Sequence, residues 1–499
     1  MRTKLFILGS AAVALSVAVG VVAATGASAT PGTEQGPSSS QAPYLVRTRP
    51  GIVTTSVLTT GDSVAGYRMA GIPDGLGAFD NGDGTFTVVM NHEIPAGLGV
   101  ARAHGSAGAF VSRWVIDKQT LAVLHGEDLL HRIYQWNAAS AAWQQIGPGA
   151  PQLTLSRLCS ADLPAVSAFY DAASGLGTRQ RIFMNGEESG VEGRAFGTVV
   201  TGPDAGSAYN LGALGHFSWE NSVAKPDAGI TTAVAGLDDS GNGQVYIYLG
   251  SKKSTGNDVE KAGLTGGNLY GIRISGVASE NDSTTVAAGG ASFSLVPLGN
   301  VTQLSGGQLE ALSVANGVSG LNRPEDGSWD PSDPHNFYFN TTASFTGISR
   351  MWKLTFADPA NLLAGGVATI ETKSPAFDST KSNADQAGPR MFDNMTVNGR
   401  GQVIALEDVG NNAYLGGVYQ YDPSTGALAR IAQHDPALFG VGAPGFITQD
   451  EESSGVIPAP FLGEGMYLID VQNHKASADP ALVEGGQLLV MHIPPGRPV

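Results

Sequence analysis

The stretch NRPEDGSWDP, residues 322–331, is the part of the sequence from which the fold can first be predicted. Pro324 favours an extended backbone at Arg323, and alternate residues of an extended chain project to the same side. Arg323 and Glu325 are therefore expected to lie side by side. A turn rich in Asp and Pro (330–334) follows, and then a predicted strand over 336–340. A guanidinium beside a carboxylate is typical either of a salt bridge at a strand end or of a site that holds a cation and an oxyanion together.

The same order of elements recurs along the chain. Each copy has an acidic or Pro-acid pair, a turn rich in Asn, Asp and Gly, and a strand that is apolar or alternating. The copies cover residues 73–90, 219–249, 324–340 and 392–406, with looser copies at 159–184 and 450–471. Repeats built from short strands are typical of a β-propeller. We therefore predict an all-β propeller of six blades with loop or helical insertions, with five or seven blades as alternatives.

Five acids occupy corresponding places in these repeats. They are Asp74, Glu220, Glu325, Asp393 and Glu451. In a propeller the innermost strands line a central channel, so these carboxylates would converge on one axis. A ring of buried carboxylates is mutually repulsive unless cations lie among them. The repeat pattern therefore favours a metal site over a salt bridge as the role of Glu325.

Several predicted strands also end in polar groups. Residues 91–93, 187–188 and 407–408 follow apolar strands, and they include Glu93 and Glu188. One such ending is ordinary protection of a strand edge. Three of them predict a polar mouth to the channel.

Composition limits the class of partner. Only 14% of the 499 residues are charged and 68 are glycine, which is typical of many strands joined by turns. The net charge is −16. Such an acidic surface repels phosphate backbones and anionic lipid, so we expect neither nucleic acid nor a membrane surface as a partner. Bound divalent cations are compatible with it.

The N-terminal segment is typical of a secretory signal peptide. Arg2 and Lys4 precede an apolar run over residues 5–24, and a small-residue cleavage site ends at Ala29. We predict a signal peptide over 1–29, a disordered spacer over 30–43 and a single propeller domain over 44–499. An uncleaved anchor helix is the alternative. The leader has no Arg-Arg pair, so we expect a secreted protein exported without the twin-arginine signal. We also expect a monomer.

The chain has one cysteine, Cys159, so it cannot form an internal disulfide. Cys159 is either a buried small side chain or a metal thiolate. Carboxylates suit Ca²⁺, whereas a thiolate among them indicates a softer metal such as iron. Clustered cations can convert water into a hydroxide or oxide nucleophile and hold an anionic ester. Arg323 would then bind the substrate oxygens in a two-pronged manner.

At these residues the sequence resembles the PhoX-type alkaline phosphatase family. The resemblance rests on Asn91-His92-Glu93, Cys159 upstream of Glu187-Glu188, the segment 216–220, Arg323-Pro324-Glu325, and Phe392-Asp393-Asn394 followed by 399–401. It implies a six-bladed propeller with a mixed Fe³⁺ and Ca²⁺ centre that hydrolyses phosphate monoesters outside the cytoplasm. By this resemblance Arg323 corresponds to the phosphate-contacting arginine, and the metal ligands are Cys159, Glu220 and Glu325, with Glu93, Glu188 and Asp393 as further candidates.

The sequence therefore predicts a secreted metal-dependent phosphomonoesterase acting on a small phosphate ester. Two alternatives are a calcium-dependent propeller hydrolase of the phytase or lactonase kind, in which Cys159 is only buried, and a non-catalytic secreted propeller stabilised by Ca²⁺.

Overall fold

A computed structural model describes residues 32–496. The predicted signal peptide and its cleavage site lie outside these residues. The described chain is mostly β-strand, as predicted, with three α-helices at α1 (Asp258–Lys261), α2 (Gly306–Ala315) and α3 (Pro436–Phe439). Within residues 32–496, no helix combines the length and the apolar character that crossing a membrane requires.

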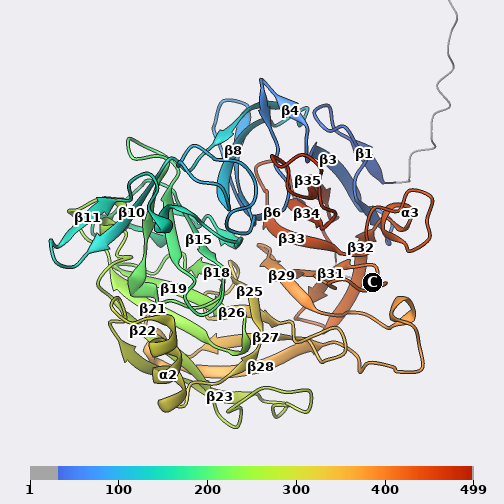
Figure 1. The fold of residues 1–499 in the computed structure, drawn as a ribbon. Coiled ribbons are helices and arrows are strands. Elements are labelled where there is room, and N and C mark those ends of the chain that lie inside the picture. The colour runs from blue at the N-terminus through green and yellow to red at the C-terminus, as the bar shows by residue number, and fades with distance from the viewer. Residues whose placement is uncertain (1–31, 497–499) are drawn as a thin grey trace, which may run out of the picture.

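Six blades of mainly antiparallel strands are arranged around a central axis (Figure 1). Their first two strands form the six hairpins predicted from the repeats. From the axis outwards, blade one is β6 (Pro73–Asp80), β7 (Thr85–His92), β8 (Phe110–Asp117) and β9 (Val123–Asp128). Blade two is β12 (Leu158–Asp162), β15 (Ile182–Glu187), β16 (Ala195–Val199), β17 (Ser207–Asn210), β10 (Arg132–Asn137) and β11 (Ala142–Gln145).

Blades three and four share one continuous sheet because their outermost strands pair with each other. Blade three is β18 (Trp219–Ala224), β19 (Thr231–Asp238), β21 (Val245–Ser251), β22 (Asn268–Ile274) and β23 (Ala291–Gly299). Blade four is β25 (Pro324–Trp329), β26 (Asn336–Thr341), β27 (Arg350–Phe356) and β28 (Gly366–Lys373). Their joined edges leave fewer backbone groups unpaired at the rim.

The last two blades each take outer strands from the beginning of the chain. Blade five is β29 (Phe392–Val397), β30 (Val403–Glu407), β31 (Gly417–Asp422), β32 (Ala427–His434) and β2 (Leu45–Arg47). Blade six is β33 (Glu451–Pro458), β34 (Met466–Asn473), β35 (Gly485–His492), β3 (Val53–Thr59) and β1 (Thr33–Gln35). The β3–β35 and β2–β32 pairs close the ring through backbone hydrogen bonds between the two ends of the chain.

The predicted disordered spacer over 30–43 is wrong for the part that the structure describes. Thr33–Gln35 forms β1, which pairs in parallel with β3. Ser39 is buried, and its hydroxyl hydrogen-bonds to that of Thr59 at 2.9 Å. The segment is ordered because β3 would otherwise be an open edge strand, and β1 satisfies its backbone groups.

The hydrophobic core lies between neighbouring blades. Trp219, Phe217 and Tyr246 stack in the cluster between blades two and three, with ring centroids 3.9 Å and 4.9 Å apart. Trp329 and Phe337 belong to the cluster between blades three and four. The inner strands of neighbouring blades also contact one another around the whole ring. This packing fixes the inner strands, and with them the side chains at the axis.

Candidate metal centre

A β-bulge interrupts the inner strand of every blade at the same place. Where the inner strand pairs with the second strand, two of its residues lie opposite one residue in five blades, and blade one has a comparable register shift after Asp74. The bulges contain Asp74-Gly75, Cys159-Ser160, Glu220-Asn221, Glu325-Asp326, Asp393-Asn394 and Ser454-Gly455. A bulge bends its strand and redirects a side chain. The same local geometry therefore presents five potential ligands.

Blade six departs from the predicted ring. Glu451 lies before the bulge of β33, and its Oε1 accepts a hydrogen bond from the amide of Gly416. The bulge position itself holds Ser454. The expectation that Glu451 occupies the same place as Glu325 is therefore wrong, because β33 starts earlier relative to its bulge than the other inner strands do.

A second set of polar groups lies where the second strand of a blade ends. Glu93, Asp239, Asp408 and His474 each follow directly on the last residue of β7, β19, β30 and β34, and Glu188 follows β15. In an antiparallel pair the second strand ends where the first begins, so this set lies at the same end of the propeller as the bulges. The predicted polar mouth is therefore present.

The two sets meet in one continuous cluster. Three groups, each with ligand atoms within 4.8 Å of one another, share members: Asp74, Glu93 and Cys159; Cys159, Glu188 and Glu220; Glu220, Glu325 and Asp393. All six residues predicted as ligands lie in this cluster. Asp74, which the sequence placed in the ring of acids but not among the ligands, is its seventh member.

Burial sets the electrostatics of the cluster. Loss of solvation, reinforced by neighbouring carboxylates, raises the pKa of Asp74, Glu220 and Asp393 well above the ordinary value for each side chain. Burial likewise raises the pKa values of Glu188 and Glu325, although a neighbouring arginine opposes each rise. These groups accept protons readily when no cation compensates for their charge.

Cys159 lies inside the same cluster. Burial, followed by the nearby Asp74 and Glu220, raises the pKa of its thiol well above the ordinary value. The Sγ atom donates to Oδ2 of Asp74 at 3.5 Å, and Gln472 donates to the same oxygen at 2.9 Å. A bound cation would reverse this preference, because a coordinating thiol is deprotonated.

The donor set fits metal ions. Oε1 of Glu220 is buried and accepts no hydrogen bond from any residue in the described part of the chain. Buried polar atoms normally have a hydrogen-bond partner, so such exceptions require an explanation. Carboxylate oxygens within a few ångströms of one another suit Ca²⁺, and the thiolate of Cys159 suits a softer metal.

Arg323 lies at the edge of the cluster. Its Nε and Nη2 donate to the two carboxylate oxygens of Asp239 at 2.8 and 2.9 Å, and Nη2 lies 2.8 Å from Oε1 of Glu325. The predicted proximity of Arg323 and Glu325 is thus observed. The predicted extended backbone at Arg323 is wrong, since its φ is 62°, in the left-handed region. The carbonyl of Arg323 accepts from the amide of Thr342, which holds the chain in this turn as it enters β25.

Arg157 is a counterpart that the sequence analysis missed. It lies two residues before Cys159, as Arg323 lies two before Glu325, and its φ is 48°. Its Nη2 lies 2.8 Å from Oε1 of Glu93, and it also pairs with the Glu188 carboxylate. Within residues 32–496, nothing accepts a hydrogen bond from Nη1 of either arginine. The sequence did contain a signal for Arg157, because it precedes a bulge ligand by the same two residues as Arg323 does.

Asp239 and His474 were also missed as parts of the site. Asp239 lies in the segment 238–243, whose Asp, Ser, Asn and Gly residues are typical of a turn, and its carboxylate binds Arg323. Burial lowers the pKa of His474, but hydrogen bonds to Glu452 and Glu484 outweigh this and raise it to about 11. A charged His474 therefore compensates for two further acids at the mouth.

His92 is a structural residue. Its ring stacks on Phe110 with centroids 4.3 Å apart, and its two nitrogens hydrogen-bond to Gly71 and Ser112. Burial lowers its pKa to about 3, so the ring stays neutral.

Buried asparagines on the second strands support the bulges from behind. Asn91 Nδ2 donates to the carbonyl of Cys159 at 2.6 Å, and its Oδ1 accepts from Asn185 at 2.9 Å. In blade four, Asn340 donates in the same way to the carbonyl of Asp393 at 2.7 Å. These bonds fix the direction in which the bulge residues point.

Replacing Asn91 with alanine is expected to lower the free energy of unfolding by about 1–3 kcal/mol, because it leaves two buried polar groups unpaired. Urea unfolding measures the effect. Asn81→Ala, at the exposed turn of the same hairpin, is the matched control and should cost less. Equal costs for the two variants would show that Asn91 does not support the bulge.

Comparison with solved structures gives a similar protein of the same architecture. Pseudomonas fluorescens PhoX in complex with vanadate, a transition-state analogue, is 12% identical, covers 90% of this chain and 96% of its own, and has a TM-score of 0.57. This chain has a PhoX-like fold.

Two propellers named as gluconolactonases are more distant. The one from Xanthomonas campestris is 10% identical, covers 90% of this chain and all of its own, and has a TM-score of 0.30. The periplasmic one from Pseudomonas aeruginosa is 12% identical, covers 85% of this chain and 89% of its own, and has a TM-score of 0.37. No protein-family model matches the chain, and no curated protein shows a significant match to its sequence.

Proposed function

We propose that this protein is a secreted, metal-dependent hydrolase of small phosphate monoesters. The observation that supports this most strongly is the contact between Arg323 and Glu325. Arg323 can bind an anion, while Glu325 belongs to a group of three carboxylates whose ligand atoms lie within 4.8 Å. An anionic ester held by cations at this group would lie next to the guanidinium. The vanadate bound to the structurally similar PhoX is consistent with the same class of ligand.

Under this proposal the seven clustered side chains would hold cations, with Cys159 binding a softer metal and the carboxylates binding Ca²⁺. Bound cations would supply Lewis acidity and lower the pKa of water at the site.

The chain's own residues would orient the substrate. Arg323 and Arg157 each keep Nη1 available while their other nitrogens are fixed by acids. A guanidinium held in this way loses little further freedom when it donates to a phosphate oxygen. Because both arginines are partly exposed, with side-chain exposures of 31% and 45%, they can meet a substrate that enters from the mouth.

A second candidate is a propeller hydrolase that uses calcium alone. The hydrogen bond from the Cys159 thiol to Asp74 favours it, because a thiol that keeps its proton is a poor metal ligand. The third candidate, a calcium-stabilised propeller without catalysis, uses the same carboxylates.

Elemental analysis of the purified protein without added metals, combined with hydrolysis assays, separates these candidates. Iron and calcium together with cleavage of p-nitrophenyl phosphate support the phosphomonoesterase. Calcium alone with cleavage of phytate or gluconolactone supports the second candidate, and calcium with no cleavage supports the third.

Cys159→Ser provides an independent prediction. We expect this variant to lose the iron of the wild-type protein and to hydrolyse p-nitrophenyl phosphate more slowly, because a hydroxyl does not replace a thiolate for a soft metal. Ser160→Ala, the next residue in the same bulge, is the matched control and should retain iron. A Cys159→Ser variant with unchanged metal content and turnover would contradict the mixed-metal proposal.

A further inference from the structure

A cavity of about 400 Å³ lies on the outer rim of the propeller, between blades two and three and away from the axis. Its walls come from the β10–β11 hairpin, the end of β17, the segment after α1 and the segment after β23. Figure 1 shows this hairpin projecting from the side of the ring. Trp136 and Trp143 form one wall of the cavity, and polar side chains form much of the rest: Asn210, Lys253, Glu260, Asn300, Thr302 and Gln303.

The two tryptophans are directly opposite each other across the β10–β11 hairpin. Their ring centroids are 5.5 Å apart with an angle of 70° between the planes, so the rings form a corner. Tyr209 packs against Trp143 at 5.1 Å and holds it in place. The other four of the six tryptophans in the chain are buried, with exposures of 6% or less, whereas Trp136 and Trp143 are partly exposed. Of the two rings, Trp143 also packs against the core cluster between blades two and three, and Trp136 does not belong to that cluster.

Two polar groups in this cavity have no partner among residues 32–496. Oδ1 of Asn210 and Nε1 of Trp143 are buried and make no hydrogen bond there. Asn210 is itself 91% buried, from an exposed fraction of 9%. A buried indole N–H and a buried amide oxygen normally pair. One donor and one acceptor are therefore unpaired in residues that line this cavity.

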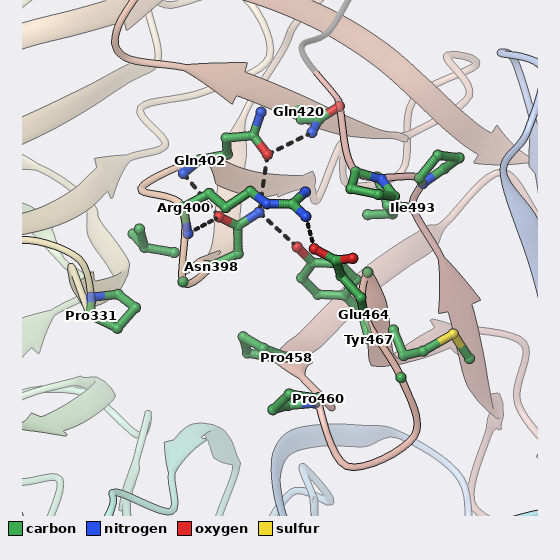
Figure 2. A pocket seen from close by; sticks show the side chains of 17 residues that line it. Pro331, Asn398, Arg400, Gln402, Gln420, Pro458, Pro460, Glu464, Tyr467 and Ile493 are labelled. Carbon is green, nitrogen blue, oxygen red and sulfur yellow. Dashed lines mark hydrogen bonds and ion pairs between the residues drawn. The ribbon is translucent and has the colours of Figure 1, made fainter.

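A second cavity, of about 630 Å³, shows that this arrangement is not general on the surface. It lies between blades five and six at the end opposite the metal centre, and its lining includes several prolines (Figure 2). There the polar side chains bond to one another. Arg400 pairs with Glu464, and Asn398 donates to Tyr467 at 3.0 Å. The paired polar groups that we describe in that cavity do not need a polar ligand as hydrogen-bond partner.

We propose that the rim cavity binds a neutral saccharide ring. A pyranose presents a face of C–H groups, which packs against an aromatic ring, and hydroxyls that both donate and accept hydrogen bonds. Trp136 and Trp143 provide the aromatic corner, and Asn210 provides the unpaired amide. The charges of Lys253 and Glu260 in the wall offset each other, and the protein carries a net charge of −16, so an anionic ligand such as a nucleotide is disfavoured. The cavity volume is at the small end of the range for ligand pockets.

Titration of the full chain with N-acetylglucosamine, glucose, galactose, mannose, chitobiose and cellobiose tests this proposal, with tryptophan fluorescence and calorimetry as readouts. We expect saturable binding of at least one sugar with a Kd on the order of 1 mM or tighter. Trp136→Ala should weaken that binding about tenfold or more, since it removes one aromatic face. Trp143→Phe keeps a ring but removes the N–H, and it should weaken binding less.

Gln135→Ala is the matched control, because Gln135 neighbours Trp136 on β10 but does not line this cavity. It should bind sugar as the wild-type protein does. Circular dichroism checks folding, and Gln303→Ala, an exposed wall residue, gives a second test if Trp136→Ala does not fold. The proposal is overturned if none of the six sugars binds, if the wall variants bind as tightly as Gln135→Ala, or if adenosine binds while the sugars do not.

Discussion

We expect chelation to lower the melting temperature of this protein by removing bound cations, and to do so more at about pH 8 than at about pH 5. For a cation present at a thousand times its Kd, the stabilisation lost is about 4 kcal/mol. The acids at the axis are the reason. Asp74, Glu220, Glu325 and Asp393 are buried side by side, and without cations their charges are uncompensated.

The direction of the pH effect follows from their pKa values. Burial raises the pKa of Asp408 from 3.8 to about 7, and it raises those of the ring acids well above their ordinary values. The chelated folded protein therefore binds more protons than the unfolded chain does. The stability that these acids contribute is fully present below about pH 4, near their pKa values in the unfolded chain. It is lost as the pH rises through their pKa values in the folded protein. Protons act as weak substitutes for the cations.

Thermal melts at several pH values, with and without EDTA, measure this effect. Glu220→Gln removes one buried charge and should flatten the pH dependence of the chelated protein. Asp227→Asn changes an exposed acid remote from the axis and should leave it unaltered. A chelated protein that becomes more stable as the pH rises from about 5 to 8 would contradict the proposed role of the ring.

Replacing Arg323 with alanine is expected to lower kcat/KM for p-nitrophenyl phosphate by about 10²–10³, the usual range for loss of one donor to a developing negative charge. The guanidinium is fixed by Asp239 and lies beside Glu325, so it is already oriented before substrate arrives. Arg323→Lys keeps the charge but loses the planar fork, and it should recover only part of the activity.

Loss of Arg323 also leaves the carboxylates of Asp239 and Glu325 without their partner, so metal content must be measured for each variant. Arg400→Ala is the matched control, because Arg400 pairs with Glu464 at the opposite end of the propeller. Its turnover should equal that of the wild-type protein. Wild-type turnover by Arg323→Ala with full metal content would remove Arg323 from the substrate site.

Local sequence carries most of the information on the inner hairpins. The turn over 80–84 and the alternating strand after it are short-range signals, and they recur in each blade. The acids near the start of each inner strand could therefore be aligned, and the six predicted ligands do come together. Glu451 was misplaced because its repeat was aligned by residue type, whereas the bulge at Ser454 fixes the register.

Features that depend on distant contacts had no such signal. Pro324 favours an extended Arg323, but the chain must turn sharply to enter β25, and the bond to Thr342 holds φ in the left-handed region. Asp239 resembled an ordinary turn residue until Arg323, far along the chain, was placed next to it. The strand at Thr33–Gln35 becomes ordered only through its partner β3.

The ring closure has a consequence for the order of folding. Thr54 of β3 pairs with Met491 of β35, and Leu45 of β2 pairs with His434 of β32. A chain made from its N-terminus therefore keeps its first strands without their partners until almost all of it has been synthesised. Pairing at such a sequence separation is slow because the intervening chain must first be brought together. Blades one to four can form from consecutive segments, whereas blades five and six, and with them the Ser454 side of the ring, are completed last.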